Sequence, residues 1–109
     1  MIYKLLDGIQ IIKLEGSVLQ SESIRIERYF SEIFASNFKN VVIDLTEAKH
    51  ISSAVLGQMV FIKKKLVSQS GDIKLIITDD DILELFDLTM LNKVFQIFET
   101  HEQAIESYK

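Results

Sequence analysis

The feature that most limits the fold is a regular change of hydrophobic period along the chain. Residues 41–45 and 73–77 are short, nearly continuous apolar runs, as expected of strands covered on both faces. Between them, residues 53–69 carry apolar side chains at helical spacing, and Gly71 is expected to end that helix. Strands that alternate with helices predict an α/β fold with a largely parallel sheet.

The N-terminal residues add an antiparallel strand to this sheet. Residues 1–6 and residues 10–15 are strand candidates, and Gly16 is expected to end the second of them. Asp7-Gly8 lies between the two candidates and is a strong signal for a two-residue turn. We therefore expect a mixed sheet that begins with a hairpin.

The remaining elements follow the same patterns. Residues 21–36 are expected to form a helix with Ser21 or Ser23 as N-cap. Residues 82–88 are expected to form a short helix and residues 94–98 a last strand. A terminal helix is expected to begin at Thr100, with Gln103 completing a capping box. The absence of proline and of Gly/Ser-rich segments gives no sign of a linker. The prediction is one domain, residues 1–109, in which a mixed, mostly parallel sheet of about four or five strands packs against about four α-helices.

The amino-acid composition excludes several classes of functional site. With no cysteine, the chain has no disulfide and no thiolate metal site, and its four glycines are scattered instead of forming a phosphate-binding loop. No serine lies in a G-x-S-x-G elbow, so we expect no catalytic residues, no cofactor and no metal. A net charge of −4 gives no basic surface that would favour binding to nucleic acid. No apolar run approaches the roughly 20 residues that a transmembrane helix needs. With no signal peptide at the N-terminus, the expected location is the cytoplasm.

Ser52 and Ser53 are the most informative residues. They stand where a buried strand leads, through a polar connection at residues 46–50, into an amphipathic helix. One interpretation is helix capping, in which a serine side chain accepts a backbone N–H and contributes roughly 1 kcal/mol. The other is a phosphorylation switch, because the helix N-terminus stabilises an anion and a phosphoserine carries about −1.5 to −2 charges that repel a docked partner.

Several stretches together resemble a known family. Gly16 is followed by V-V-I-D-L at residues 41–45, I-S-S-A-V-L at 51–56 and L-F-D-L-T-M-L at 85–91. In this order the motifs resemble the STAS domain, the fold of bacterial anti-sigma factor antagonists and of the cytoplasmic domain of sulfate transporters. The family pattern has V-V-I/L-D-L, then M-D-S-S/T-G-L-G or I-S-S-A-G-L-R, and later L-F-x-L/M-S/T-G-L. The resemblance covers essentially the whole chain.

The resemblance assigns roles to individual residues. Ser53 falls on the family's phosphorylatable serine, with Ser52 as the alternative, and Ser52 takes the place of the usual preceding Asp. Val55 and Met90 replace family glycines, and a β-branched Val55 is expected to add bulk beside the docking surface. Leu19 stands where the family commonly has an acidic residue near the phosphosite. The partner-binding residues implied in this way are Leu19, Ser52, Ser53, Ala54, Val55 and Leu56.

The function that the resemblance implies is partner switching. The partner is an anti-sigma factor of the ATP-binding serine kinase type, with other STAS proteins or a phosphatase as further partners, and phosphate on Ser53 breaks the docking. The alternative is a STAS scaffold or assembly subunit whose switch has been lost. A third possibility is a small-molecule or nucleotide binder.

Three groups of side chains have simpler interpretations. Lys63, Lys64 and Lys65 fan around a helix and are expected to be solvated, and Asp79, Asp80 and Asp81 are expected to favour the start of a helix instead of binding a cation. Aromatic side chains without interleaved basic residues are expected in the core: Phe30, Phe34, Phe61, Phe86, Phe95 and Phe98.

Overall fold

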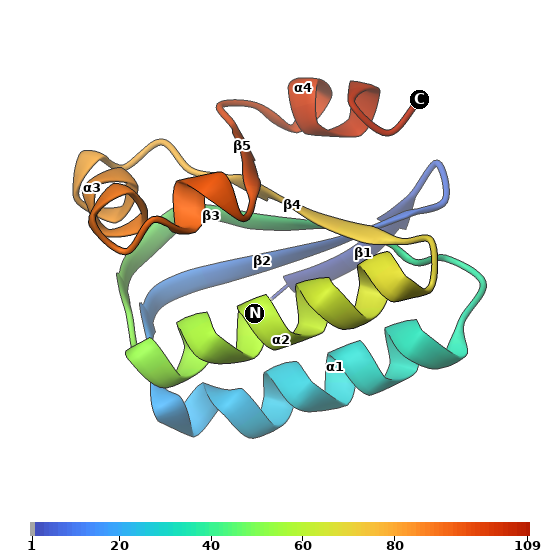
Figure 1. The fold of residues 1–109 in the computed structure, drawn as a ribbon, viewed down its shortest axis with the longest axis horizontal. Helices are drawn as coiled ribbons and strands as arrows, with labels where there is room; N and C mark the ends of the chain where they lie inside the picture. The colour runs from blue at the N-terminus through green and yellow to red at the C-terminus, as the bar shows by residue number, and fades with distance from the viewer. Residues whose placement is uncertain (1) are drawn as a thin grey trace.

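The computed structural model describes residues 2–109 and shows a sheet with helices on both faces (Figure 1). The five strands are β1 (Ile2–Leu6), β2 (Ile9–Val18), β3 (Asn40–Ile51), β4 (Asp72–Ile76) and β5 (Gln96–Phe98). The α-helices are α1 (Ser23–Ala35), α2 (Ser53–Ser68), α3 (Asp80–Leu88) and α4 (His101–Glu106), with 3₁₀ turns η1 (Gln20–Glu22) and η2 (Leu91–Lys93). The predicted α/β fold, with its strand and helix numbers, is confirmed.

The sheet is mixed in the way the sequence predicts. The strand order is β1-β2-β3-β4-β5, in which β1 pairs antiparallel to β2 and every other pair is parallel. Asp7 and Gly8 have φ values of 53° and 76°, which is the left-handed conformation that a tight hairpin turn of this hand requires. The predicted N-terminal hairpin is therefore confirmed.

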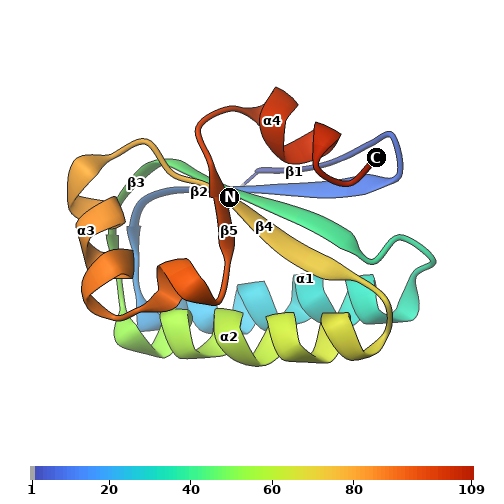
Figure 2. The same ribbon diagram turned by 45° about the horizontal axis from the view of Figure 1, so that its top comes forward.

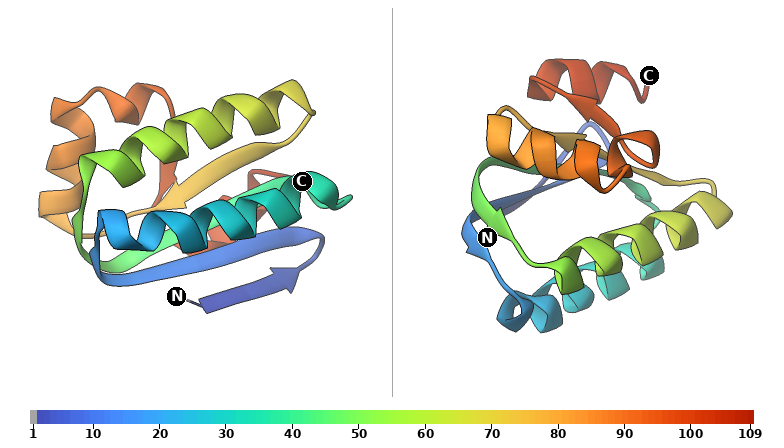
Figure 3. Two further views of the ribbon diagram at one scale, coloured as in Figure 1. Left: turned by 90° about the horizontal axis from the view of Figure 1, so that it is seen from below. Right: turned by 60° about the vertical axis from the view of Figure 1, so that its left-hand side comes forward.

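The helices divide into two layers. Figures 2 and 3 show α1 and α2 side by side under one face of the sheet and α4 on the other face. Strand β3 serves both layers, because Val41, Ile43 and Leu45 belong to the larger core under α1 and α2 while Val42 belongs to the smaller core under α4. Burial on both faces explains why residues 41–45 are almost uniformly apolar.

The strands β2 and β3 are longer than predicted. Gly16 does not end β2, and residues 46–50, expected as a loop, belong to β3. The ladder continues through register shifts between Lys13 and Glu15 and between Gly16 and Ser17, where Gly16 adopts a φ of 65°. These irregularities are typical of β-bulges, which a pattern of strict alternation does not reveal.

Helix starts were predicted with mixed success. Neither Ser21 nor Ser23 caps α1, whose N-cap residue is Glu22 without a side-chain capping bond, because the chain enters α1 directly from η1. Thr100 does cap α4 by accepting the N–H of Gln103 at 3.1 Å. Among residues 2–109, no helix is long and apolar enough to cross a membrane.

The predicted roles of two side chains on α2 are wrong. Phe61 was expected in the core but is 66% exposed, because it lies on the side of α2 that faces away from the sheet. Lys63 was expected to be solvated, but its ammonium is half-buried and pairs with the carboxylate of Asp72. Asp79, by contrast, caps α3 through the N–H of Ile82, as predicted for a helix start.

Candidate functional site

The ends of β2 and β3 place Ser52 beside Leu19. The two strands pair up to Val18 and Ile51, and the backbone N–H of Ser52 then donates to the Val18 carbonyl at 2.9 Å. The next residue, Leu19, begins the turn into η1, because its carbonyl accepts the N–H of Glu22 at 2.9 Å. The start of α2 is thus tied to the end of β2, at the left-hand end of the sheet in Figure 1.

Ser52 is the N-cap of α2. Its backbone is extended, with φ −72° and ψ 154°, and its hydroxyl accepts the N–H of Val55 at 3.2 Å. Its carbonyl accepts the first bond of the helix from the N–H of Leu56 at 3.0 Å. The capping interpretation is therefore confirmed for Ser52, whose hydroxyl satisfies one of the N–H groups that a helix start leaves unpaired.

Ser53 is the first residue of α2 and is exposed. Within the described part of the chain, its hydroxyl makes no hydrogen bond, in contrast to the hydroxyl of Ser52. The backbone N–H groups at the first turn of a helix point toward its N-terminus and carry the positive end of the helix dipole. A phosphate on the Ser53 hydroxyl would therefore meet a favourable field without disrupting the cap.

The other predicted partner-binding residues fall into two groups. Ala54 and Leu19 are exposed, and the side chain of Leu19 is 45% accessible. Val55 and Leu56 are buried under α2, and Val55 is 0% exposed. The expectation that these two side chains contact a partner, and that Val55 adds bulk beside the docking surface, is wrong, because this side of α2 packs onto the sheet.

A second exposed apolar group lies at the same end of the sheet and was not predicted from the sequence. Leu88 ends α3 and is exposed, and Met90 follows in a left-handed conformation with a φ of 62°. Figure 1 shows α3 and the start of α2 at this end. The positive φ explains why the family pattern has glycine at the position of Met90, since a residue without Cβ adopts this conformation without strain. The glycine of the family pattern was therefore the sequence signal for a left-handed backbone at this position.

A buried carboxylate, that of Asp44, lies on the face of the sheet that α4 covers. The Asp44 side chain is 4% exposed and accepts hydrogen bonds from the backbone N–H (2.9 Å) and hydroxyl (2.7 Å) of Thr46, and the Nε2 atom of His101 lies 2.7 Å from its second oxygen. Burial alone would raise the pKa of Asp44, but these hydrogen bonds outweigh it and lower the pKa. Among the described residues, no group of three or more His, Cys, Asp or Glu could hold a metal ion.

Several solved structures share this fold. A crystal structure from Thermotoga maritima, described as a putative anti-sigma factor antagonist, has a TM-score of 0.89 at 22% identity and covers 97% of this chain and 92% of its own. The anti-sigma factor antagonist SpoIIAA in its unphosphorylated form has a TM-score of 0.85 at 16% identity, covering 98% and 94%. The phosphorylated form of Bacillus SpoIIAA has a TM-score of 0.75 at 16% identity, covering 99% and 100%. These identities establish a shared fold.

Sequence comparison identifies the family. A Thermotoga maritima protein that is named a putative anti-sigma factor antagonist is 24% identical over 109 residues, which cover 98% of this chain and 96% of that protein. Residues 2–104 match the sequence profile of the STAS domain. That match spans both sheet faces and the Ser52-Ser53 helix start, and the chain belongs to the STAS domain family.

Proposed function

We propose that this STAS domain is an anti-sigma factor antagonist, and that phosphorylation of Ser53 controls its binding to an anti-sigma factor of the ATP-binding serine kinase type. The observation that carries the proposal is the Ser53 hydroxyl, which is exposed and unbonded within residues 2–109 while its neighbour Ser52 caps α2. The names of the sequence relatives support the antagonist role. SpoIIAA, which shares the fold, is described in both unphosphorylated and phosphorylated forms.

The geometry separates the two serines. The Ser52 hydroxyl is engaged as the cap of α2, so a kinase that takes this oxygen as its nucleophile must first break a helix cap worth roughly 1 kcal/mol. A phosphate on Ser53 leaves this hydrogen bond in place. Kinase access therefore favours Ser53, and we infer that Ser52 is a structural residue.

The surface around Ser53 explains how a phosphate would release a partner. Leu19 and Ala54 are exposed next to the start of α2 and offer apolar contact area. A partner that buries them must also desolvate the position of the Ser53 side chain, and a group with about −1.5 to −2 charges there carries a large desolvation cost. The unmodified protein binds and the phosphorylated protein dissociates.

The test starts from the partner in the native host. The tagged protein is purified, co-purifying proteins and phosphosites are identified by mass spectrometry, and the affinity of the captured anti-sigma factor is measured for variants. We expect Ser53→Asp to weaken binding by about tenfold or more, whereas Ser53→Ala binds like wild type. Ser68→Asp adds the same charge near the other end of α2 and serves as the control.

Two outcomes contradict the proposal. If Ser53→Asp binds the captured partner as tightly as wild type does, phosphorylation of Ser53 does not control docking. If the partner co-purifies with protein that carries no phosphate on Ser53 under any growth condition, the scaffold interpretation replaces the switch. Weakened binding by Ser68→Asp would show that the charge acts without regard to its position.

A further inference from the structure

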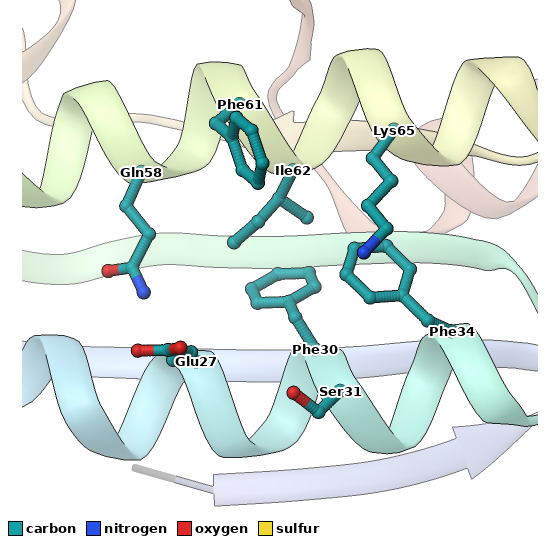
Figure 4. Close-up of a pocket in the computed structure, with 8 residues that line it drawn as sticks. All are labelled: Glu27, Phe30, Ser31, Phe34, Gln58, Phe61, Ile62 and Lys65. Atoms are coloured by element: carbon teal, nitrogen blue, oxygen red, sulfur yellow. The ribbon is translucent and has the colours of Figure 1, made fainter.

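A groove between α1 and α2 is separate from the Ser53 surface, which consists of Leu19, Ser53 and Ala54. It is about 290 Å³ in volume and is lined by Glu27, Phe30, Ser31, Phe34, Gln58, Phe61, Ile62 and Lys65 (Figure 4). Phe61 stands at its rim and is 66% exposed, which is unusual for a large aromatic side chain next to apolar neighbours. An exposed aromatic side chain beside a groove offers apolar contact area to another molecule.

The two ends of the groove carry opposite chemistry. At one end, Glu27 forms no ion pair with any described residue, and the Oε1 atom of Gln58 is buried without a hydrogen-bond partner. The amide nitrogen of Gln58 is used, since it donates to the Ser23 carbonyl at 3.0 Å. At the other end, the ammonium of Lys65 lies 4.3 Å from the centre of the Phe34 ring. The Glu27 end of the groove is therefore acidic, and the Lys65 end is basic.

The spacing of these groups is symmetric about Phe61. Gln58 and Lys65 are separated by about 10 Å along α2 at a rise of roughly 1.5 Å per residue, and Phe61 lies near the midpoint. The helices α1 and α2 run in the same direction. Glu27 on α1 therefore lies beside Gln58 at one end of the groove, and Lys65 lies beside Phe34 at the other end. A two-fold axis that lies in the interface, at right angles to the helices and next to Phe61, brings the acidic end of one copy to the basic end of the other.

We propose that the α1–α2 groove is the interface of a symmetric homodimer. In this dimer the Lys65 ammonium of each copy donates to the Glu27 carboxylate of the other, and the two Phe61 side chains meet near the axis. The surface is self-complementary, as a two-fold interface requires.

The dimer keeps the Ser53 surfaces accessible. Because α2 of one copy runs antiparallel to α2 of the other, the two Ser53 residues lie at opposite ends of the interface, each about 13 Å from the axis along the helix. The dimer thus presents two docking surfaces that face apart. The dimer is tested by substitutions at Glu27 and Lys65, whereas partner binding is tested by substitution of Ser53. Failure of one proposal is therefore distinguishable from failure of the other.

The test uses charge reversal and analytical ultracentrifugation at increasing protein concentration. We expect the wild-type protein to approach twice the 12.5 kDa of one chain as its concentration rises. Glu27→Lys and Lys65→Glu should each weaken self-association by about tenfold or more, because each variant opposes like charges twice across the axis. Lys93→Glu on η2 changes the net charge equally and should dimerise like wild type.

Mixing the two single variants gives the sharpest result. A copy with Glu27→Lys and a copy with Lys65→Glu form two opposite-charge contacts, so the mixture should associate about tenfold or more tightly than either variant does alone. General attraction does not explain this outcome, because the parent charge of −4 leaves both variants net negative. Wild-type protein that stays monomeric at millimolar concentration overturns the proposal. A dimer that survives both reversals, or a mixture that stays monomeric, overturns it as well.

Discussion

The buried Asp44 should make the stability of this domain depend on pH through one carboxylate. Asp44 receives three short polar contacts, two from Thr46 and one from His101, which belongs to the C-terminal helix α4. Replacing Asp44 by Asn keeps the shape and the acceptor that faces Thr46 but removes the negative charge. Hydrogen bonds to a charged group contribute about 1.5–3 kcal/mol and neutral ones about 1. We therefore expect Asp44→Asn to lower the free energy of unfolding by about 2 kcal/mol at neutral pH.

The sign of the pH dependence follows from the direction of the pKa change. The pKa of Asp44 is lowered from its ordinary value of 3.8, because its hydrogen bonds overcome the effect of burial. The charged carboxylate therefore favours the folded state, and its contribution is complete above the ordinary pKa. This contribution is lost as the pH falls through the lowered value, when the carboxylate in the folded protein is protonated.

The assay is urea unfolding of wild type and Asp44→Asn between pH 7 and pH 2. The difference in unfolding free energy between the two proteins should be about 2 kcal/mol at pH 7 and should shrink below pH 4. Glu84→Gln, which removes an exposed carboxylate on α3, is the control and should change stability by less than about 0.5 kcal/mol. A difference below about 0.5 kcal/mol at pH 7, or one that stays constant down to pH 2, would refute the reasoning.

Three further substitutions test individual contacts by the same urea unfolding. Met90→Gly should raise the free energy of unfolding by about 0.5–1 kcal/mol, because it relieves a φ of 62° at a side chain that is 55% exposed; a loss of stability would contradict this reading. Gly71→Ala should lower it by about 1–3 kcal/mol, because the new Cβ would lie 2.3 Å from the Lys39 carbonyl oxygen; Gly57→Ala, which meets open space, is the control and should not be destabilising. Tyr108→Phe should lower it by about 1–2 kcal/mol, because its partly buried hydroxyl bonds the Val41 carbonyl at 2.6 Å, the Asp72 carbonyl at 2.9 Å and the Val41 N–H at 3.2 Å; an unchanged urea midpoint would show that these bonds contribute nothing.

The start of α2 shows how far sequence reasoning reached at the candidate site. The pair Ser52-Ser53 was expected at a helix N-terminus, and the structure has Ser52 as N-cap and Ser53 as the first helical residue. The sequence left the roles of the two serines open, since either hydroxyl can cap a helix. Only the hydrogen bond from the N–H of Val55 to Ser52 distinguishes them.

Val55 and Phe61 show where one-dimensional patterns failed. Both are large apolar residues on one helix, and the side of the helix that each occupies depends on how α2 rotates against the sheet. Packing buries Val55 completely and leaves Phe61 at the rim of a groove. Hydrophobicity alone does not tell a core side chain from one that a partner covers.

The sequence by itself determined the order and type of the elements, the N-terminal hairpin and the position of the two serines at a helix start. These features depend on local physics: the periodicity of apolar side chains, the turn preference of Asp7-Gly8 and the capping chemistry of serine. Only the tertiary structure decided the contact between Asp44 and His101, the close approach of Gly71 to Lys39 and the polarity of the α1–α2 groove. Each of these joins residues far apart in the chain, and their proximity is set by how strands and helices pack.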